Sequence, residues 1–258
     1  MKRFLVTTAA VWAVSLAASW SACDAASLGG ANLTGTVSID YARIRTEGLG
    51  ANSFGGNGSL LASFANPGVN VQLDVGGERL RVDGENSKGW SGALDGFWRD
   101  SKGVFGVTAA HGVPQWADGM HNTSYGVFGE WYFWPELTLR GNGGWSKLNA
   151  NGESRSGGFV GLAAEYYFIP DLGFTLGGDY TSLKGQNIKS THVATEYQLF
   201  RSFPLSLRAS YDYQKFGQTN TSAYMFRLKY RFGGSGALVE MDRSGPVEWT
   251  GASPLFHL

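Results

Sequence analysis

The feature that most constrains the fold is an alternation of apolar and polar residues with a period of two, which runs from Leu33 to Phe232. It is clearest in the segment AYMFRLKYRF at 223–232, where five apolar side chains share one face of an extended chain. The opposite face carries Met225, Arg227, Lys229 and Arg231. A period of two indicates β-strands, because successive side chains point to opposite faces. A soluble β-sandwich alternates in the same way, so the period alone does not identify the solvent outside.

The N-terminus has the order of a secretory signal peptide. Lys2 and Arg3 precede an apolar stretch from Phe4 to about Trp20, and small residues follow. We expect residues 1–25 to be removed by cleavage after Ala25, which also removes the only cysteine, Cys23. The alternative is lipidation at Cys23. Either way, the pattern predicts an exported protein.

The composition narrows the class. Glycine accounts for 38 of the 258 residues, and charged residues for only 16%, against a usual share of about 25%. No segment after residue 26 has the run of about 18 apolar residues that a membrane helix needs. The formal net charge is zero, so nucleic acid is not an implied partner. The chain is therefore expected to be a secreted β-protein or a transmembrane β-barrel.

Connections of two kinds alternate along the chain. Short turns are expected near 66–68, 99–103, 134–136, 169–172 and 200–204. Longer segments rich in Gly, Asn and Ser lie near 45–56, 77–88, 111–122, 146–157, 183–188 and 215–221. Short periplasmic turns and longer external loops are typical of antiparallel up-and-down barrels in the outer membrane. The spacing predicts about 12 strands in residues 26–232, with both termini on the periplasmic side. Residues 233–258 are expected to form a periplasmic tail, with a segment folded into the lumen as the alternative.

Three hairpins share one spacing, in which an outward Leu is followed eight residues later by an outward aromatic. The pairs are Leu137 and Trp145, Leu172 and Tyr180, and Leu205 and Tyr213. Eight residues of tilted strand rise about 20 Å, close to the apolar band of about 25 Å in membrane barrels. The spacing favours two aromatic girdles facing lipid, with Trp131 and Phe133 in one and Trp145 in the other. A hydrophobic core hairpin in a soluble sandwich is the alternative.

At this point the sequence resembles the small porin-like outer-membrane β-barrels of Gram-negative bacteria. Tyr230 and Phe232, two residues apart, are similar to the insertion signal that the barrel assembly machinery reads, although Arg227 stands where that signal has Gly. The resemblance implies outer-membrane lipid, the barrel assembly machinery and small hydrophilic solutes as partners. It implies a narrow passive channel, with a non-conducting structural or surface-interaction barrel as the alternative. The oligomeric state stays open.

The polar face is expected to line the lumen. Pairing Phe133 with Leu137 places Glu130 opposite Arg140, and pairing Leu199 with Leu205 places Glu196 opposite Arg208. Glu165 lies at the same height but faces Thr175. The expected pore-lining residues are Glu130, Arg140, Glu165, Glu196, Arg208, Asp212, Arg227, Lys229 and Arg231. A water-filled lumen would screen these charges, whereas a dry lumen would bury them as ion pairs that plug the barrel. Five inward aromatics, Phe97, Phe128, Tyr132, Phe159 and Tyr167, argue against a wide pore.

Catalytic groups are sparse. Asp118 with His121, and Asp179 with His192, are the nearest candidates for an acidic and histidine pair at the rim, and a solvated histidine explains both more simply. There is no phosphate-binding glycine loop, zinc spacing or calcium loop. We therefore expect no enzyme activity, no cofactor and no metal site.

Overall fold

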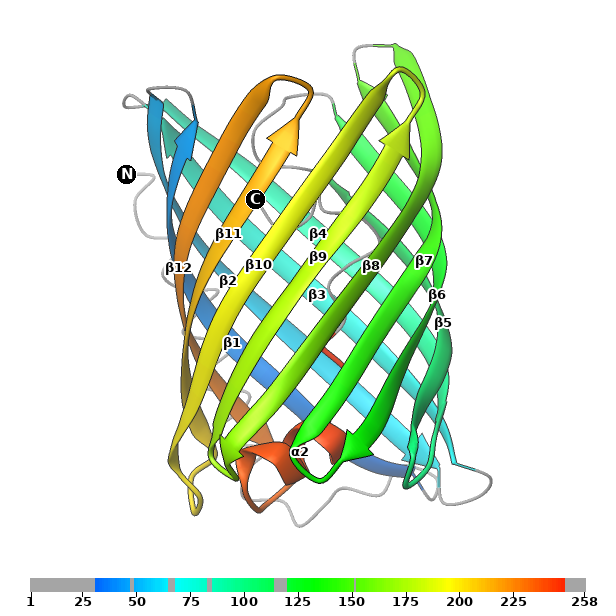
Figure 1. Cartoon of the computed structure of the whole chain (residues 1–258), viewed down its shortest axis with the longest axis vertical. Helices are drawn as coiled ribbons and strands as arrows, with labels where there is room; N and C mark the ends of the chain where they lie inside the picture. Colours follow the sequence, from blue (N-terminus) through cyan, green and yellow to red (C-terminus); the bar gives the residue numbers. More distant parts are fainter. Residues whose placement is uncertain are drawn as a thin grey trace, which may run out of the picture.

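The computed structural model describes residues 31–46, 49–64, 68–82, 85–113, 120–150 and 152–248. The expected signal peptide at 1–25 and the end of the tail lie outside these residues. Twelve strands and one helix are described (Figure 1). They are β1 (Ala31–Thr46), β2 (Leu49–Phe64), β3 (Val69–Val82), β4 (Glu85–Arg99), β5 (Gly103–Val113), β6 (His121–Trp134), β7 (Leu137–Ala150), β8 (Glu153–Ile169), β9 (Leu172–Leu183), β10 (Gln186–Phe200), β11 (Leu205–Phe216), β12 (Thr219–Phe232) and α2 (Leu238–Ser244).

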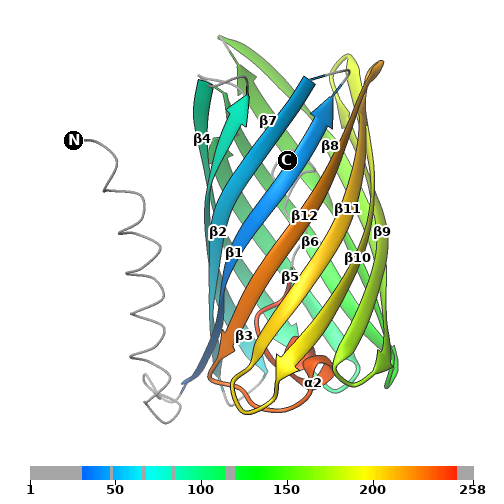
Figure 2. The ribbon, with the colours of Figure 1, turned by 90° about the vertical axis from the view of Figure 1, so that its left-hand side faces the viewer.

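The strands form one closed antiparallel barrel in which each strand pairs with its neighbours along the chain. β1 closes the barrel against β12, with Val37 opposite Tyr230 and Asp40 opposite Arg227. The predicted up-and-down barrel with about twelve strands is therefore confirmed. Figure 2 shows the side of the barrel where β1 and β12 lie next to each other. None of the twelve described strands has an unpaired edge in the closed barrel, as a β-structure surrounded by apolar lipid requires.

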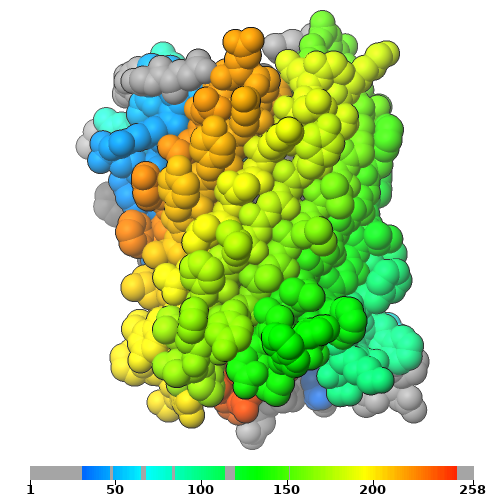
Figure 3. Space-filling view, in the orientation of Figure 1, coloured from blue at the N-terminus to red at the C-terminus, as the bar shows by residue number. Residues whose placement is uncertain are grey.

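The wall separates apolar from polar side chains as the period of two predicts. On β12 the outward Phe226 is 55% exposed, whereas the inward Lys229 is 3% exposed. The girdle residues Trp131, Phe133 and Trp145 are exposed as well. Figure 3 shows the outer wall that the later strands form side by side. A wall whose exposed side chains are mostly large apolar residues fits contact with lipid.

The ends of the hairpins differ from the expectation. Most segments expected to be longer external loops are paired strand, so β9 and β10 are separated only by residues 184–185, and the connection at 114–120 is the longest. Pairing at the opposite end also differs, because Trp134 rather than Phe133 lies opposite Leu137, and Phe200 rather than Leu199 opposite Leu205. An irregularity in each strand inserts one residue next to the turn. The inward register beyond these irregularities is unchanged.

The chain reverses after β12 and enters the barrel. Gly233 has a φ of 75°, and a Cβ there would lie 2.3 Å from the carbonyl oxygen of Leu33, so only glycine fits this turn. Helix α2 then buries Leu238 and Met241, three residues apart on one face. The N-terminus of the helix is capped by a hydrogen bond in which the Ala237 amide donates to the Glu240 carboxylate over 3.0 Å.

Helix α2 sits within the ring of strand ends, at the end of the barrel with the β8–β9 turn (Figures 1 and 2). The amide of Val239 donates to the carbonyl of Pro170 in that turn over 3.1 Å. The described part of the tail therefore does not extend away from the barrel as expected, but follows the alternative of a segment folded into the lumen. No helix in the described ranges is long and apolar enough to cross a membrane.

Close strand packing makes Gly157 sensitive to substitution. A Cβ at Gly157 on β8 would lie 1.5 Å from the backbone carbonyl oxygen of Ser182, whereas at the adjacent Gly158 the nearest atom is 3.7 Å away. We expect Gly157→Ala to lower the free energy of unfolding by roughly 1–3 kcal/mol through overpacking, and Gly158→Ala to change it little. Urea unfolding of both variants measures this, and equal effects would contradict the close approach.

Candidate functional site

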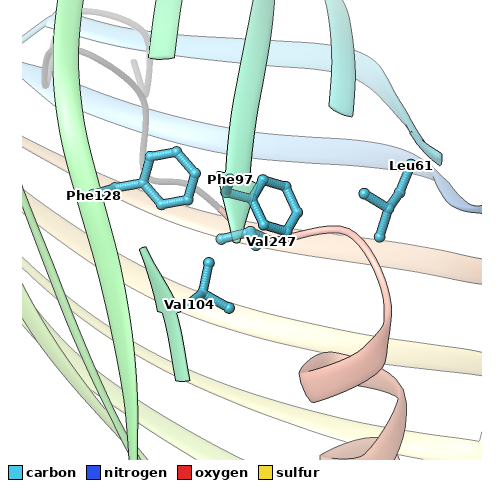
Figure 4. Packing of buried hydrophobic residues seen from close by; sticks show 5 residues of the cluster. All are labelled: Leu61, Phe97, Val104, Phe128 and Val247. Carbon is cyan, nitrogen blue, oxygen red and sulfur yellow. The ribbon is translucent and has the colours of Figure 1, made fainter. Parts of the chain in front are cut away.

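The charged side chains of the candidate site lie in the lumen of the barrel, and the tail fills one end of this lumen. Val247 packs among Leu61, Phe97, Val104 and Phe128 (Figure 4). Its amide donates to the Gln72 side-chain oxygen over 2.8 Å, and its carbonyl accepts from the Gln72 side-chain nitrogen over 3.0 Å. The aromatics expected to point inward do so, since Phe97, Phe128, Phe159 and Tyr167 are buried and Tyr132 is partly buried. The cluster around Val247, with Tyr132 against it, therefore packs this end of the lumen with side chains.

The first charged cluster joins β6, β7 and β8. The Arg140 Nε lies 2.9 Å from Glu130 Oε1, and its Nη2 lies 2.7 Å from Glu165 Oε2. The predicted registers that place Glu130 opposite Arg140 and Glu165 opposite Thr175 are confirmed. Sequence reasoning missed the partner of Glu165 because it looked only within the β8–β9 hairpin. Arg140 reaches Glu165 across the β7–β8 pairing.

The second charged cluster surrounds Glu196 on β10. Its carboxylate lies 2.8 Å from Arg231, 3.0 Å from Lys229 and 3.7 Å from Arg208. The Ser206 hydroxyl also donates to it over 2.5 Å. The predicted opposition of Glu196 and Arg208 is confirmed. One carboxylate of the wall thus faces three cations, so the wall alone carries an excess of positive charge here.

Carboxylates of the tail supply the missing negative charge. Asp242 on α2 lies 2.5 Å from Arg231 and accepts a hydrogen bond from the Tyr167 hydroxyl over 3.0 Å. Glu248 lies 2.8 Å from Arg208 and also forms an ion pair with Lys229. Sequence reasoning did not include these tail carboxylates, because it placed residues 233–258 outside the barrel. The excess of inward cations on β11 and β12 could have indicated that carboxylates from outside these strands, such as those of the tail, lie next to them.

Two arginines fasten the helix to the barrel rim. Arg243 lies over the ring of Tyr132 at 4.8 Å and donates to the Trp134 carbonyl over 2.8 Å. Arg99 donates to the carbonyls of Ser244 and Gly245 over 2.8 and 2.7 Å, which satisfies backbone groups that the end of a helix leaves unpaired. The tail is thus held by apolar, ionic and backbone contacts together.

A cavity of about 310 Å³ occupies the lumen on the other side of the tail. Its lining runs from Ile44 and Gln214, near the strand ends opposite α2, to Glu248. Four of the predicted pore-lining residues, Arg208, Asp212, Arg227 and Lys229, border it. Arg227 is paired with Asp40 at 2.5 Å. Glu130 and Arg140 border a smaller cavity of about 30 Å³, whereas Glu165, Glu196 and Arg231 are buried in the clusters described above. The predicted set therefore divides between a cavity wall and a buried ionic core.

Comparisons with known proteins agree with this architecture. An outer-membrane channel from Pseudomonas putida F1 superimposes with a TM-score of 0.59 over 82% of this chain and 98% of its own, at 12% identity. The fold is that of a porin-like outer-membrane β-barrel. The KdgM porin in complex with disordered oligogalacturonate (TM-score 0.49, 13% identity, 75% of this chain and 98% of that one) and the CymD monoaromatic hydrocarbon channel (0.48, 9%, 79% and 89%) are more distant. At such identities the likeness concerns the fold alone. No family model and no curated protein matches the sequence.

Three of the four histidines of this porin-like barrel lie within the described residues. His192 Nδ1 lies 3.8 Å from Asp179 Oδ2, and the rings of His111 and His121 stack at 6.4 Å. Asp118, the expected partner of His121, lies outside the described residues. Within those residues, no group of three or more His, Cys, Asp or Glu side chains is placed to hold a metal ion.

Proposed function

We propose that the protein is a narrow passive channel of the outer membrane for small hydrophilic solutes. The observation that carries this proposal is the cavity of about 310 Å³ inside a closed barrel, whose lining combines charged and hydroxyl side chains with apolar ones. Twelve strands lie between the 8 that leave an interior filled by side chains and the 16 or so that leave an open channel. The exposed apolar wall supports placement in lipid. We propose no catalytic role.

The tail makes the path narrow. Val247 and Glu248 form one boundary of the cavity, and α2 lies beyond them at the barrel end. A solute that passes through the barrel from one end to the other would have to move past these residues. Conduction therefore requires the tail to move away from the path. This filling also favours the second candidate, a non-conducting structural or surface-interaction barrel.

The proposal includes insertion of the barrel into the outer membrane by the barrel assembly machinery. This insertion is predicted from Tyr230 and Phe232 at the end of β12. The Tyr230 ring stacks on Phe203 at 4.7 Å, so this strand end carries an aromatic cluster on the same level as the turns.

Single-channel recording in planar bilayers tests the proposal. We expect small discrete current steps from the full-length protein, and larger steps from Gln72→Leu, because this change removes both hydrogen bonds to Val247. Gln214→Leu is the matched control, since Gln214 is likewise a buried inward glutamine but lies near the strand ends opposite α2. Absence of steps from all three proteins would favour the non-conducting barrel.

A further inference from the structure

The charges around Glu196 do not balance within the barrel wall. Arg208, Lys229 and Arg231 carry three positive charges, and Glu196 is the wall carboxylate that contacts them. Asp242 and Glu248 of the tail complete the cluster. Burying a cation without a counter-charge destabilises the folded protein. The three cations and one carboxylate of the wall therefore need two further carboxylates from outside the wall.

Glu248 meets this demand with a geometry specific to a carboxylate. One of its oxygens, Oε2, lies 2.8 Å from Arg208 Nη1, while the other, Oε1, pairs with Lys229 Nζ. Each oxygen thus has its own cation. Charge-assisted hydrogen bonds of this kind are the strong ones in proteins, and arginine suits planar anions.

The position of this pair differs from that of the other tail carboxylate. Arg208, Lys229 and Glu248 all border the large cavity, so a solute in the cavity that displaces Glu248 would meet both cations. Asp242, in contrast, is not part of the cavity lining and lies between Arg231 and Tyr167. Arg227, the next cation along β12, is paired with Asp40. The Asn57 side-chain amide donates to the same carboxylate. The pair of cavity cations that the tail covers is therefore Arg208 with Lys229.

We propose that Arg208 and Lys229 form a binding site for the carboxylate group of small organic acids that enter the cavity, and that Glu248 occupies this site as an internal competitor. The inference rests on the proposed function in that it treats the ligand as a solute of the lumen. Displacement of Glu248 also loosens the tail next to Val247, so the same event that binds the solute widens its path.

Isothermal titration of the full-length protein in detergent with sodium glutarate tests the site directly. Because a competitor reduces the apparent affinity by the fraction of free sites, Glu248→Gln should bind glutarate at least about tenfold more tightly than the wild type. Glu240→Gln is the matched control on the same tail, since a glutamine can still accept from the Ala237 amide, and it should bind as the wild type does. Glutaramide, the neutral analogue, should not bind.

A double variant ties the binding to the proposed cations. Glu248→Gln combined with Arg208→Gln should lose the gained affinity, and Glu248→Gln combined with Arg208→Lys should keep part of it. The heat-dependent shift in electrophoretic mobility reports whether each variant is a folded barrel. If the Arg208→Gln variant does not fold, the comparison of Glu248→Gln with the wild type decides.

Three outcomes would overturn the inference: Glu248→Gln binding no tighter than the wild type, gained affinity that survives in folded Arg208→Gln, or sulfate binding as tightly as glutarate. Titration does not depend on conduction, so the two proposals fail separately. A barrel that binds glutarate but passes no current would remove the channel function and leave the site. A conducting barrel without the gain in Glu248→Gln would do the reverse.

Discussion

Replacing Leu94 with arginine is expected to lower the free energy of unfolding by roughly 2–4 kcal/mol. Leu94 points outward from β4 and is 56% exposed. It lies four residues from each of two outward tryptophans, Trp90 and Trp98, and therefore at the middle of the apolar belt between the aromatic girdles. A guanidinium at this depth has no water or counter-charge, which makes the penalty largest there.

Ser91→Arg on the same strand is the matched control. Ser91 faces the large cavity, where Asp74 and Glu78 also border the lumen. An added cation there meets polar and acidic surroundings, so we expect a clearly smaller loss. Urea unfolding of both variants in lipid vesicles measures the difference. Equal losses at the two positions would contradict a lipid-facing outer wall.

The strand faces and the inward register could be predicted from the sequence because a slip of one residue would exchange the two faces of a strand. Glu130 opposite Arg140 is the example, since the position of the short turn at 134–136 sets this register and a slip of one residue would turn apolar neighbours inward. The last pair before the turn was wrong for a local reason. Beside Pro135 and Glu136 the pairing shifts by one residue, and periodicity does not encode such an irregularity.

The lengths of the loops could not be read from composition. The segment LGANSFGGNG at 49–58 is rich in residues that disfavour strands, yet Leu49 pairs with Thr46 and Gly58 with Val37. Strand preferences depend on context, and in a closed barrel each strand is paired on both sides. Pairing with β1 therefore extends β2 to within two residues of β1 along the chain.

The sequence left the position of the tail open between two alternatives for a different reason. Its contacts join residues far apart in the chain, such as Gln72 with Val247, and α2 is too short for a helical period to stand out. Charge balance was the available clue. Arg208, Lys229 and Arg231 have one wall carboxylate between them, and Asp242 and Glu248 are acidic residues of the tail.

Removing Arg140 is the second large effect that we expect. The sequence left two outcomes open, a screened pair in water or a buried one. In the structure the side chains of Glu130 and Glu165 are 2% and 3% exposed and that of Arg140 is 14% exposed, which favours the buried outcome. Arg140→Met would leave both carboxylates without their shared cation. We therefore expect a loss of roughly 3–5 kcal/mol in the free energy of unfolding.

The surface pair of Arg201 and Asp171 supplies the contrast. It is as short, at 2.6 Å, but Arg201 is largely exposed, so water screens the pair and Arg201→Gln should change stability little. Adding Glu130→Gln to Arg140→Met should recover part of the loss, because one stranded carboxylate becomes neutral. Urea unfolding of the three variants in vesicles gives the comparison. If Arg140→Met costs no more than Arg201→Gln, water reaches the cluster, and the charges around Arg140 line an open path instead of a buried core.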